Sequence, residues 1–284
     1  MDIERENALQ NDFVYIEGKV PCYQSRLFSA NGIAHAFFTK KGGVSTGVFE
    51  SLNFSTGNGS IKDSRENVLK NHAIAASLFG LTVRDICRSV QTHTSTVETV
   101  NSSHRGKGLT AEPFDHGVDG MVTAEKNLLL SIRTADCVPV LLADKEGKAV
   151  GAVHAGWRGT VGGITVNAVE KMVELGARRE NIIAAIGPCI ANCCYEVGGE
   201  LFEAFTEKNE SYSAFFKPKG EKFMLDLVFA NRFILEQVGI PPENISSADI
   251  CTRCNGDRFF SHRLSGVDRG TMSAAIAIKN VNRF

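Results

Sequence analysis

Apolar residues along the chain gather in eight short runs that predict β-strands. The runs are 34–39, 96–100, 120–123, 128–132, 138–143, 149–154, 182–186 and 274–278. Several of them are continuously apolar instead of alternating with polar residues. We therefore expect both faces of these strands to be covered by other parts of the protein.

Longer segments with the spacing of amphipathic helices lie between these runs. They span about 64–79, 163–175, 198–208 and 227–238. Gly176 follows the second segment as a C-terminal cap, while Asp226 and Gly239 bound the fourth as its N-cap and its end. Because strands and helices interleave without strict alternation or a linker, the pattern predicts one mixed α/β domain over residues 1–284.

Composition and charge describe a soluble protein without a strongly charged partner. The 284 residues include 31 basic and 32 acidic side chains, which gives a net charge of −1 with neutral histidines. This balance argues against nucleic acid as a partner. The apolar runs are shorter than the roughly 20 residues that span a bilayer, so no membrane partner is expected. The polar, acidic N-terminus does not resemble a secretory signal, which predicts a cytoplasmic protein.

Two side chains suited to chemistry lie at the ends of predicted strands. Cys137 directly precedes the strand 138–143, and His154 ends the strand 149–154. The residues between these strands predict a turn, so a hairpin would bring Cys137 and His154 together. Such a pair admits two chemistries, which are a thiol nucleophile activated by an imidazole and a metal site.

A metal site needs a further ligand, and His93 is the candidate. It lies in the polar stretch 91–94 between two predicted strands. Two histidines and one cysteine leave tetrahedral zinc with one open position, which is typical of catalytic zinc. Taken singly, a cysteine is more often a small buried side chain and a histidine a satisfied polar one. Only the combination favours a metal.

Two cationic segments are candidates for binding an anion, and one carboxylate is a candidate catalytic group. Arg158 lies between Gly156 and Gly159, shortly after His154, and offers a fork for phosphate, although a turn with a surface arginine explains it equally well. Lys40 precedes a glycine pair that ends at Gly43, where a solvated hairpin turn is the simpler account. Asp136 is a candidate general acid or a carboxylate that orients a ligand histidine, with a turn residue as the alternative.

The remaining cysteines raise the question of a second metal site. Among eight cysteines in a chain without a secretory signal, free thiols, metal ligands or catalytic groups are favoured over disulfides. Cys189, Cys193 and Cys194 lie in one segment, and Cys251 and Cys254 lie in another. A CxxC with a CxxxC admits structural zinc, but one half lacks the usual knuckle. We therefore favour free thiols here and leave a second metal open.

Several of these segments together resemble a known family. Residues 134–139 read TADCVP and residues 154–159 read HAGWRG, and this pair is similar to motifs of the laccase-domain family, also called the YfiH/YlmD or polyphenol-oxidase-like proteins. The similarity extends over about 33–278. Further matching positions are 42–45, 51–53, Gln91 with His93, 187–190, 195–197, Asp226, Asn231 and 261–263.

The resemblance implies a function that composition does not. It implies a zinc-dependent purine nucleoside phosphorylase that acts on adenosine, inosine and S-methyl-5'-thioadenosine with phosphate, and that also deaminates adenosine. It also implies a layered α/β/β/α fold with mixed β-sheets. The family's zinc ligands fall on His93, Cys137 and His154.

With this function, roles follow for the other candidates. In deamination, zinc would lower the pKa of its water, and the hydroxide would attack C6 of the purine. In phosphorolysis, Arg158, Lys40 or Arg263 would hold phosphate against the ribose anomeric carbon, with Gly43 beside them. Asp136 keeps its candidate catalytic role. Lys40 stands where the family usually has arginine, which keeps the charge but loses the guanidinium fork.

Three other functions stay open from the sequence. A copper-dependent polyphenol oxidase could use the same site because copper outranks zinc in affinity, but several coppers need more ligands than His93, His104, His116 and His154 offer. A metal-free Cys–His hydrolase would use Cys137 without His93. A binding or assembly factor would need a closed zinc site with four ligands. The oligomeric state and the preferred nucleoside also stay open.

Overall fold

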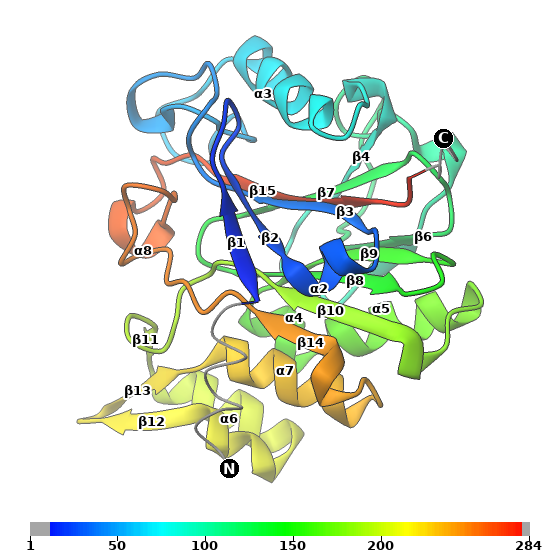
Figure 1. The fold of residues 1–284 in the computed structure, drawn as a ribbon. Coiled ribbons are helices and arrows are strands. Elements are labelled where there is room, and N and C mark those ends of the chain that lie inside the picture. The colour runs from blue at the N-terminus through cyan, green and yellow to red at the C-terminus, as the bar shows by residue number, and fades with distance from the viewer. Residues whose placement is uncertain (1–11, 280–284) are drawn as a thin grey trace.

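The computed structural model describes residues 12–279, and most of its strands form two six-stranded mixed sheets (Figure 1). In spatial order, the first sheet contains β1 (Phe13–Ile16), β2 (Cys22–Ser25), β3 (Ala34–Phe38), β15 (Met272–Ala277), β7 (Leu129–Thr134) and β4 (Ile86–Arg88). The second contains β14 (Ile245–Ser247), β10 (Ile182–Ile186), β8 (Val138–Asp144), β9 (Val150–Ala155), β6 (Gly120–Thr123) and β5 (Val97–Thr99). A small third sheet contains β11 (Glu196–Val197), β13 (Lys222–Leu225) and β12 (Phe216–Lys219).

Helices cover the outer faces of the two large sheets. Figure 1 shows α3 on the outer side of the first sheet, and α4, α5 and α7 on the outer side of the second. The helices are α2 (Arg26–Ala30), α3 (Arg65–Ser77), α4 (Trp157–Val161), α5 (Ile164–Glu174), α6 (Gly199–Lys208), α7 (Leu227–Gln237) and α8 (His262–Ser265). Short 3-10 turns lie at Gly47–Phe49, Val83–Asp85, Ser102–His104, Arg179–Asn181, Glu210–Phe215 and Pro242–Asn244. The layer order is helix, sheet, sheet, helix.

The core consists of three apolar layers that alternate with the sheets. Neighbouring residues of β8 point into different layers because side chains along a strand alternate between its faces. Val140 belongs to the layer that includes Met172 of α5. Leu141 belongs to the layer between the sheets, together with Ile132 of β7. A third layer joins the first sheet to α3 through residues such as Ala76.

All eight predicted strands and all four predicted helices are present, with bounds that differ by a few residues. The central strands are buried on both faces, as their continuous apolar runs indicated; every residue of β8 and β9 is buried. Asp226 caps α7 by accepting from the Phe229 backbone N–H at 2.9 Å, and Gly176 after α5 has φ = +95°. The mixed α/β class and the layered arrangement are confirmed.

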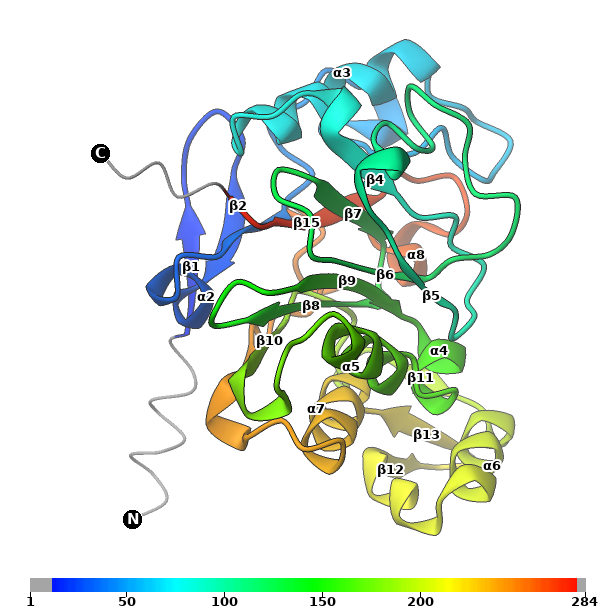
Figure 2. The same cartoon turned by 90° about the vertical axis from the view of Figure 1, so that its right-hand side faces the viewer.

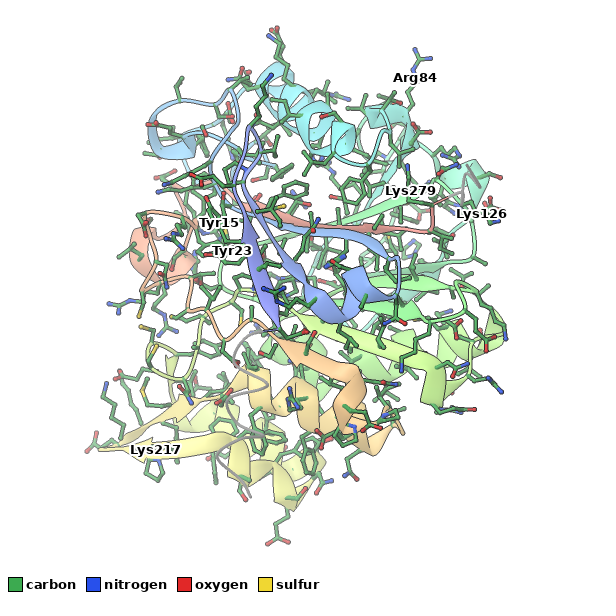
Figure 3. All side chains as sticks on the ribbon, in the orientation of Figure 1. Tyr15, Tyr23, Arg84, Lys126, Lys217 and Lys279 are labelled. Carbon is green, nitrogen blue, oxygen red and sulfur yellow. The ribbon has the colours of Figure 1, made fainter. Side chains whose placement is uncertain are left out.

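The strands that sequence patterns missed are short, with two to four residues each. In β12, Lys217 and its two C-terminal neighbours are exposed, and Lys217 projects away from the body of the molecule (Figure 3). The pair β1–β2 is held partly by the rings of Tyr15 and Tyr23, whose centroids are 5.2 Å apart (Figure 3). Strands this short offer too few positions for an apolar run, even where all their residues are buried, as in β14. Within residues 12–279, no helix combines the length and hydropathy that a bilayer span needs.

Two buried histidines are held neutral by this packing. His35 accepts a hydrogen bond from the Ser25 backbone N–H at 2.8 Å, and burial lowers the pKa of His35 to about 4. Burial also lowers the pKa of His72 to about 3, and the charges of Arg88 and Arg133 add to this effect. A cation at His72 would be buried beside the charges of Arg88 and Arg133, and at His35 the attraction of Asp12 does not offset the loss of water.

We expect mild acid to destabilise the fold through these histidines. Between about pH 6.5 and about pH 4 these two histidines are protonated in the unfolded chain but stay neutral in the folded protein. The free energy of unfolding therefore falls as the pH falls, by roughly 1.4 kcal/mol per pH unit for each histidine. Urea denaturation across this window measures the slope. His72→Leu should flatten it relative to wild type, whereas His262→Ala, at an exposed position, should not. A His72→Leu slope equal to wild type would contradict the assignment.

Candidate metal and catalytic site

Three metal-ligand side chains meet at one end of the second sheet. Figure 2 shows α4 next to the end of β9. Cys137 directly precedes β8, and His154 is paired with Pro139 in the antiparallel β8–β9 hairpin. His93 lies in the loop before β5. One ligand atom from each of the three side chains lies within 4.8 Å of the others. The predicted hairpin and the predicted meeting of these residues are both confirmed.

Asp119 fixes the two histidines from behind. It is fully buried directly before β6, and its Oδ1 lies 2.8 Å from His154 Nδ1. The backbone N–H groups of Thr92, His93 and Thr94 donate to the same carboxylate at 3.0, 3.0 and 2.9 Å. Because Nδ1 of His154 is engaged, its Nε2 is the nitrogen free to bind a metal.

Asp119 was missing from the sequence prediction. An aspartate directly before an apolar strand carries no signal of its own. Only the pairing of β6 with β9 places it beside His154, whose backbone N–H donates to the Asp119 carbonyl oxygen at 2.8 Å.

Electrostatics favour the thiolate at Cys137. Burial by itself raises the pKa of this thiol, but the charge and hydrogen bonds of His154 and His93 outweigh burial and lower the pKa to about 6. Burial disfavours the His154 imidazolium, yet attraction to Cys137 and contact with Asp119 raise its pKa. The thiolate is both the metal-binding and the nucleophilic form, so this pair is compatible with either chemistry.

The backbone around the triad is tightly constrained. A Cβ at position 156 would lie 3.2 Å from His93 Cδ2 and 3.3 Å from Cys137 Sγ, so glycine is needed for the close approach. His93 and Asp136 have φ values of +62° and +92°, in the left-handed region that residues with a side chain rarely adopt. Such backbone strain persists where surrounding contacts hold it, often at functional sites.

The donor set fits a single divalent ion. A thiolate with two imidazoles suits zinc or copper, and the carboxylate behind His154 is the outer contact that metal-bound histidines commonly have. Within the described part of the chain, no fourth His, Cys, Asp or Glu joins this group. One coordination position would therefore be open to another ligand, as in catalytic sites.

Asp136 has a different surrounding from the one expected of a histidine-orienting carboxylate. It accepts hydrogen bonds from Thr252 Oγ1 at 2.6 Å, Ser261 Oγ at 3.0 Å and the Arg263 backbone N–H at 2.6 Å. The carboxylate that contacts His154 is Asp119. Asp136 instead ties the segment 252–263 to the backbone next to Cys137.

The structure brings two of the predicted cations near Cys137. Arg158 stands two residues after Gly156, where a Cβ would lie 3.3 Å from Cys137 Sγ, and the Arg263 backbone N–H donates to Asp136, which directly precedes Cys137. Burial raises the pKa of Tyr195; the charge of Cys137 adds to this effect, and the charges of Arg158 and Arg263 oppose it. The Arg263 guanidinium lies 5.3 Å from the Tyr195 ring centroid, and Arg158 lies 4.2 Å from the centroid of Trp157. Both arginines are exposed, so they form a cationic rim that substrate can reach.

Lys40 lines a neighbouring pocket of about 440 Å³ together with Arg269. The Lys40 Nζ donates to a backbone carbonyl oxygen at 2.6 Å. Leu264, the residue after Arg263, also lines this pocket, so the pocket adjoins the segment that carries Arg263. Burial lowers the pKa of Arg269, and the charges of Asp136 and Cys137 oppose this effect. Gly43 serves packing, because a Cβ there would lie 2.3 Å from the Ser51 carbonyl oxygen.

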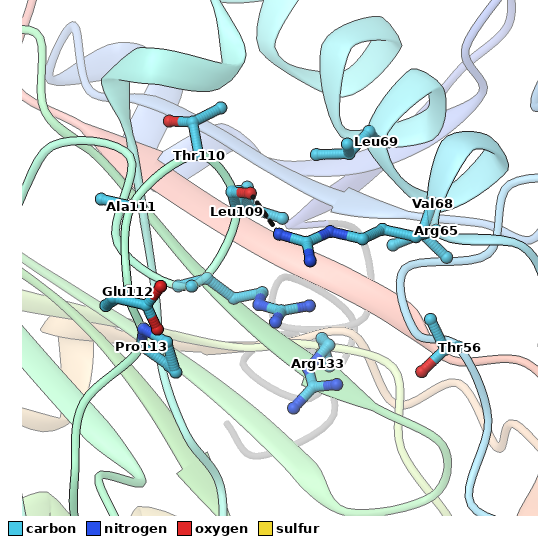
Figure 4. Close-up of a pocket in the computed structure, with 12 residues that line it drawn as sticks. Thr56, Arg65, Val68, Leu69, Leu109, Thr110, Ala111, Glu112, Pro113 and Arg133 are labelled. Carbon is cyan, nitrogen blue, oxygen red and sulfur yellow. Dashed lines mark hydrogen bonds between the residues drawn. The ribbon is translucent and has the colours of Figure 1, made fainter.

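A second cationic pocket, of about 370 Å³, lies beside α3 and was not predicted (Figure 4). Arg65, Arg88 and Arg133 line it together with Glu112. Burial lowers the pKa of Arg88 and Arg133, and none of the ion pairs found in residues 12–279 includes these three arginines. They come from three distant parts of the sequence, so no local motif marks the pocket.

Comparison with known proteins shows the family of this chain. A family model described as multi-copper polyphenol oxidoreductase laccase matches residues 34–279. The chain belongs to this laccase family. A purine nucleoside phosphorylase of Deinococcus radiodurans is 38% identical over 247 residues, which cover 87% of this chain and 89% of that protein. Adenosine deaminase RL5, from an unknown prokaryotic organism, is 36% identical over 213 residues, covering 74% and 81%.

Solved structures of similar proteins share the fold. YfiH of Bacillus licheniformis superimposes with a TM-score of 0.85 at 30% identity, covering 95% of this chain and all of that one. YlmD of Geobacillus stearothermophilus gives a TM-score of 0.82 at 31% identity, with 95% and 99% covered. The resemblance to the YfiH/YlmD proteins and the fold expected from it are confirmed.

The laccase family's description names several coppers, whereas the central histidines of this laccase-family chain build one site. His104 stacks on Phe114, with ring centroids 5.9 Å apart, and His116 contacts Glu98 at 3.1 Å. Across residues 12–279, neither histidine belongs to a group of potential metal ligands. Of the four central histidines, His93 and His154 alone are in such a group.

Replacing Asp119 should weaken metal binding. In Asp119→Asn, one oxygen that accepts from His154 or from the backbone of the His93 loop is lost, and we expect metal affinity to fall roughly 10- to 100-fold. Competition with a chromophoric chelator measures this. Asp144→Asn is the matched control, because Asp144 is equally buried but accepts only from its own turn at the far end of β8. Equal affinities in the two variants would refute the role of Asp119.

Proposed function

We propose that this protein is a purine nucleoside phosphorylase with accompanying adenosine deaminase activity, and that zinc is its metal. The observation that carries the proposal is a three-ligand site with an open position beside the cationic rim of Arg158 and Arg263. Relatives named purine nucleoside phosphorylase and adenosine deaminase match most of the chain and support the same chemistry. The substrates we propose are adenosine, inosine and S-methyl-5'-thioadenosine with phosphate.

In phosphorolysis, a phosphate oxygen bonds to the ribose anomeric carbon while the bond from that carbon to the purine nitrogen breaks. The electron pair stays on the base, which takes up a proton, and the products are the free base and ribose 1-phosphate. Methylthioadenosine gives methylthioribose 1-phosphate. The step gains from cations placed where charge develops. We assign this to Arg158 and Arg263, and assign Lys40, in the adjoining pocket, to the far end of the substrate.

The triad residues and Asp119 have separate tasks in this proposal. Cys137 is a ligand as thiolate, and Asp119 holds His154 in the tautomer that presents Nε2. Asp136 positions Cys137 and Arg263 through its three hydrogen bonds. When bound here, zinc supplies a Lewis acid with one open position, suited to activating water for deamination of adenosine.

Base release that depends on phosphate tests the function and the triad together. Purified protein with quantified metal should release hypoxanthine from inosine only when phosphate is present, and His93→Ala should lose both the metal and the release. His104→Ala is the matched control, because this half-buried histidine lies outside the ligand group. Ammonia release without phosphate dependence would leave only the deaminase. Zinc-loaded protein without turnover of any nucleoside would refute the proposal.

A metal-free Cys–His hydrolase is the second candidate, and the Cys137 thiolate beside His154 favours it. The same His93→Ala variant separates the two functions. A dyad of Cys137 and His154 would keep its activity without His93 and without metal, whereas the zinc site would not.

The arginine rim should control phosphate affinity. We expect Arg158→Ala and Arg263→Ala each to raise the KM for phosphate about tenfold or more, because each removes charge-assisted hydrogen bonds to an anion. Metal content should not change. Arg178→Ala, at an exposed surface ion pair, is the control. If Arg65→Ala raised the KM for phosphate while Arg158→Ala and Arg263→Ala left it unchanged, phosphate would bind in the pocket beside α3 and this assignment would be wrong.

A further inference from the structure

Four cysteine side chains gather outside the triad, at a junction of two loops. Cys193 and Cys194 lie in the turn between β10 and β11, and Cys251 and Cys254 lie in the loop that follows β14. Their four sulfur atoms all lie within 4.8 Å of one another. The two segments also meet through an isolated parallel bridge between Cys189 and Cys251. Residues 60 positions apart in the chain therefore build one cluster.

The spacing of the sulfurs fits one tetrahedral ion. Zinc–sulfur bonds of about 2.3 Å place the sulfurs of a tetrahedral site about 3.8 Å apart. The observed distances are 3.7 Å for Cys193–Cys194, 3.8 Å for Cys193–Cys254 and 3.4 Å for Cys194–Cys254. Disulfide sulfurs would lie only about 2.05 Å apart. An iron–sulfur cluster places several atoms between its cysteines and needs a wider cage.

The surroundings suit thiolates that bind a metal. The Ala191 backbone N–H donates to Cys251 Sγ at 3.5 Å, and Arg253 Nη1 donates to Cys194 Sγ at 3.4 Å. Four thiolates around a divalent ion carry a net charge of −2, which the Arg253 guanidinium partly offsets. Outer hydrogen bonds of this kind hold metal ligands in place.

We propose that Cys193, Cys194, Cys251 and Cys254 bind one structural zinc ion. Four protein ligands close the site, so it has no open position for a substrate, in contrast to the His93 triad. Sequence spacing favoured free thiols because the first half lacks a CxxC knuckle. In the fold, the adjacent pair Cys193 and Cys194 supplies the two ligands that a knuckle would supply. This site goes beyond the proposed function and does not depend on it.

The zinc would fasten one wall of the candidate active site. The loop that carries Cys251 and Cys254 continues to Ser261 and Arg263, which both donate to Asp136. The turn that carries Cys194 continues directly to Tyr195, the ring beneath Arg263. Crosslinking the two loops through a metal therefore holds the cationic rim against the triad.

Metal quantification on protein purified under reducing conditions, without chelators, tests the proposal. Wild type should carry two equivalents of zinc per chain. Cys254→Ser and Cys193→Ser, both at exposed positions that tolerate serine, should each lose one equivalent and keep the other. His93→Ala should lose the zinc of the triad and keep the zinc of the four cysteines. Cys189→Ala is the matched control, because this cysteine lies in the same segment but outside the ligand group, and it should keep both.

Cobalt provides a readout that does not depend on activity. In the His93→Ala protein, Co²⁺ should give the strong thiolate charge-transfer absorption of a tetrathiolate site, and adding Cys254→Ser should weaken it. The proposal would be overturned if wild type carried only one zinc equivalent and His93→Ala carried none. It would also be overturned if the His93→Ala protein with Co²⁺ showed no cobalt–thiolate absorption. A Cys194–Cys254 disulfide under reducing conditions, seen as two fewer titratable thiols, would also overturn it. Failure of the nucleoside assays would leave the zinc count unaffected, so the two proposals fail separately.

Discussion

The antiparallel pairing of β8 with β9 is the constraint on which the candidate site depends. The register that sets Pro139 against His154 brings Cys137, one step beyond the strand, beside the imidazole. Continuing the same sheet, the register of β6 with β9 sets Asp119 beside His154 from the other side. A slip by one residue would turn every side chain of a strand to the opposite face. The side chains of β8 are closely packed into apolar layers on both faces, so such a slip would require both layers to repack. Core packing and site geometry are therefore fixed together.

Asp119 shows how a buried charge can organise a site. A carboxylate removed from water is unfavourable unless hydrogen bonds satisfy it. Here burial alone would raise the pKa of Asp119, but hydrogen bonds from His154 and from the backbone of Thr92 and Thr94 lower it to about 2. The same contacts join the His93 loop to the end of β9. One satisfied carboxylate therefore places both histidines before any metal arrives, which reduces the ordering that binding must impose.

Sequence reasoning predicted those features that local pattern determines. Continuous apolar runs marked the buried strands, capping residues such as Asp226 marked helix ends, and a short turn between two strands brought Cys137 to His154. Features that depend on pairing between distant segments left no local signal. Asp119 gains its meaning only from the order of strands in the second sheet. Arg88 and Arg133 meet only because β4 lies beside β7. The strands that sequence patterns missed have only two to four residues, too few for a recognisable apolar run.

The loops that form one wall of the candidate site must be held in place by other means than the strands that position the triad. The segments 187–195 and 248–261 contain little regular structure, so backbone ladders cannot hold Tyr195 and Arg263 in place. Side chains must supply the order instead. At one end, Asp136 accepts three hydrogen bonds from the second segment and stands next to Cys137 in the chain. At the other end, the four cysteines join the two segments.

A wall fastened at both ends restricts loops that would otherwise be free to move, and it keeps the arginine rim at a fixed distance from the triad. The cysteine cluster thus holds these loops in position, just as strand pairing holds the triad in position.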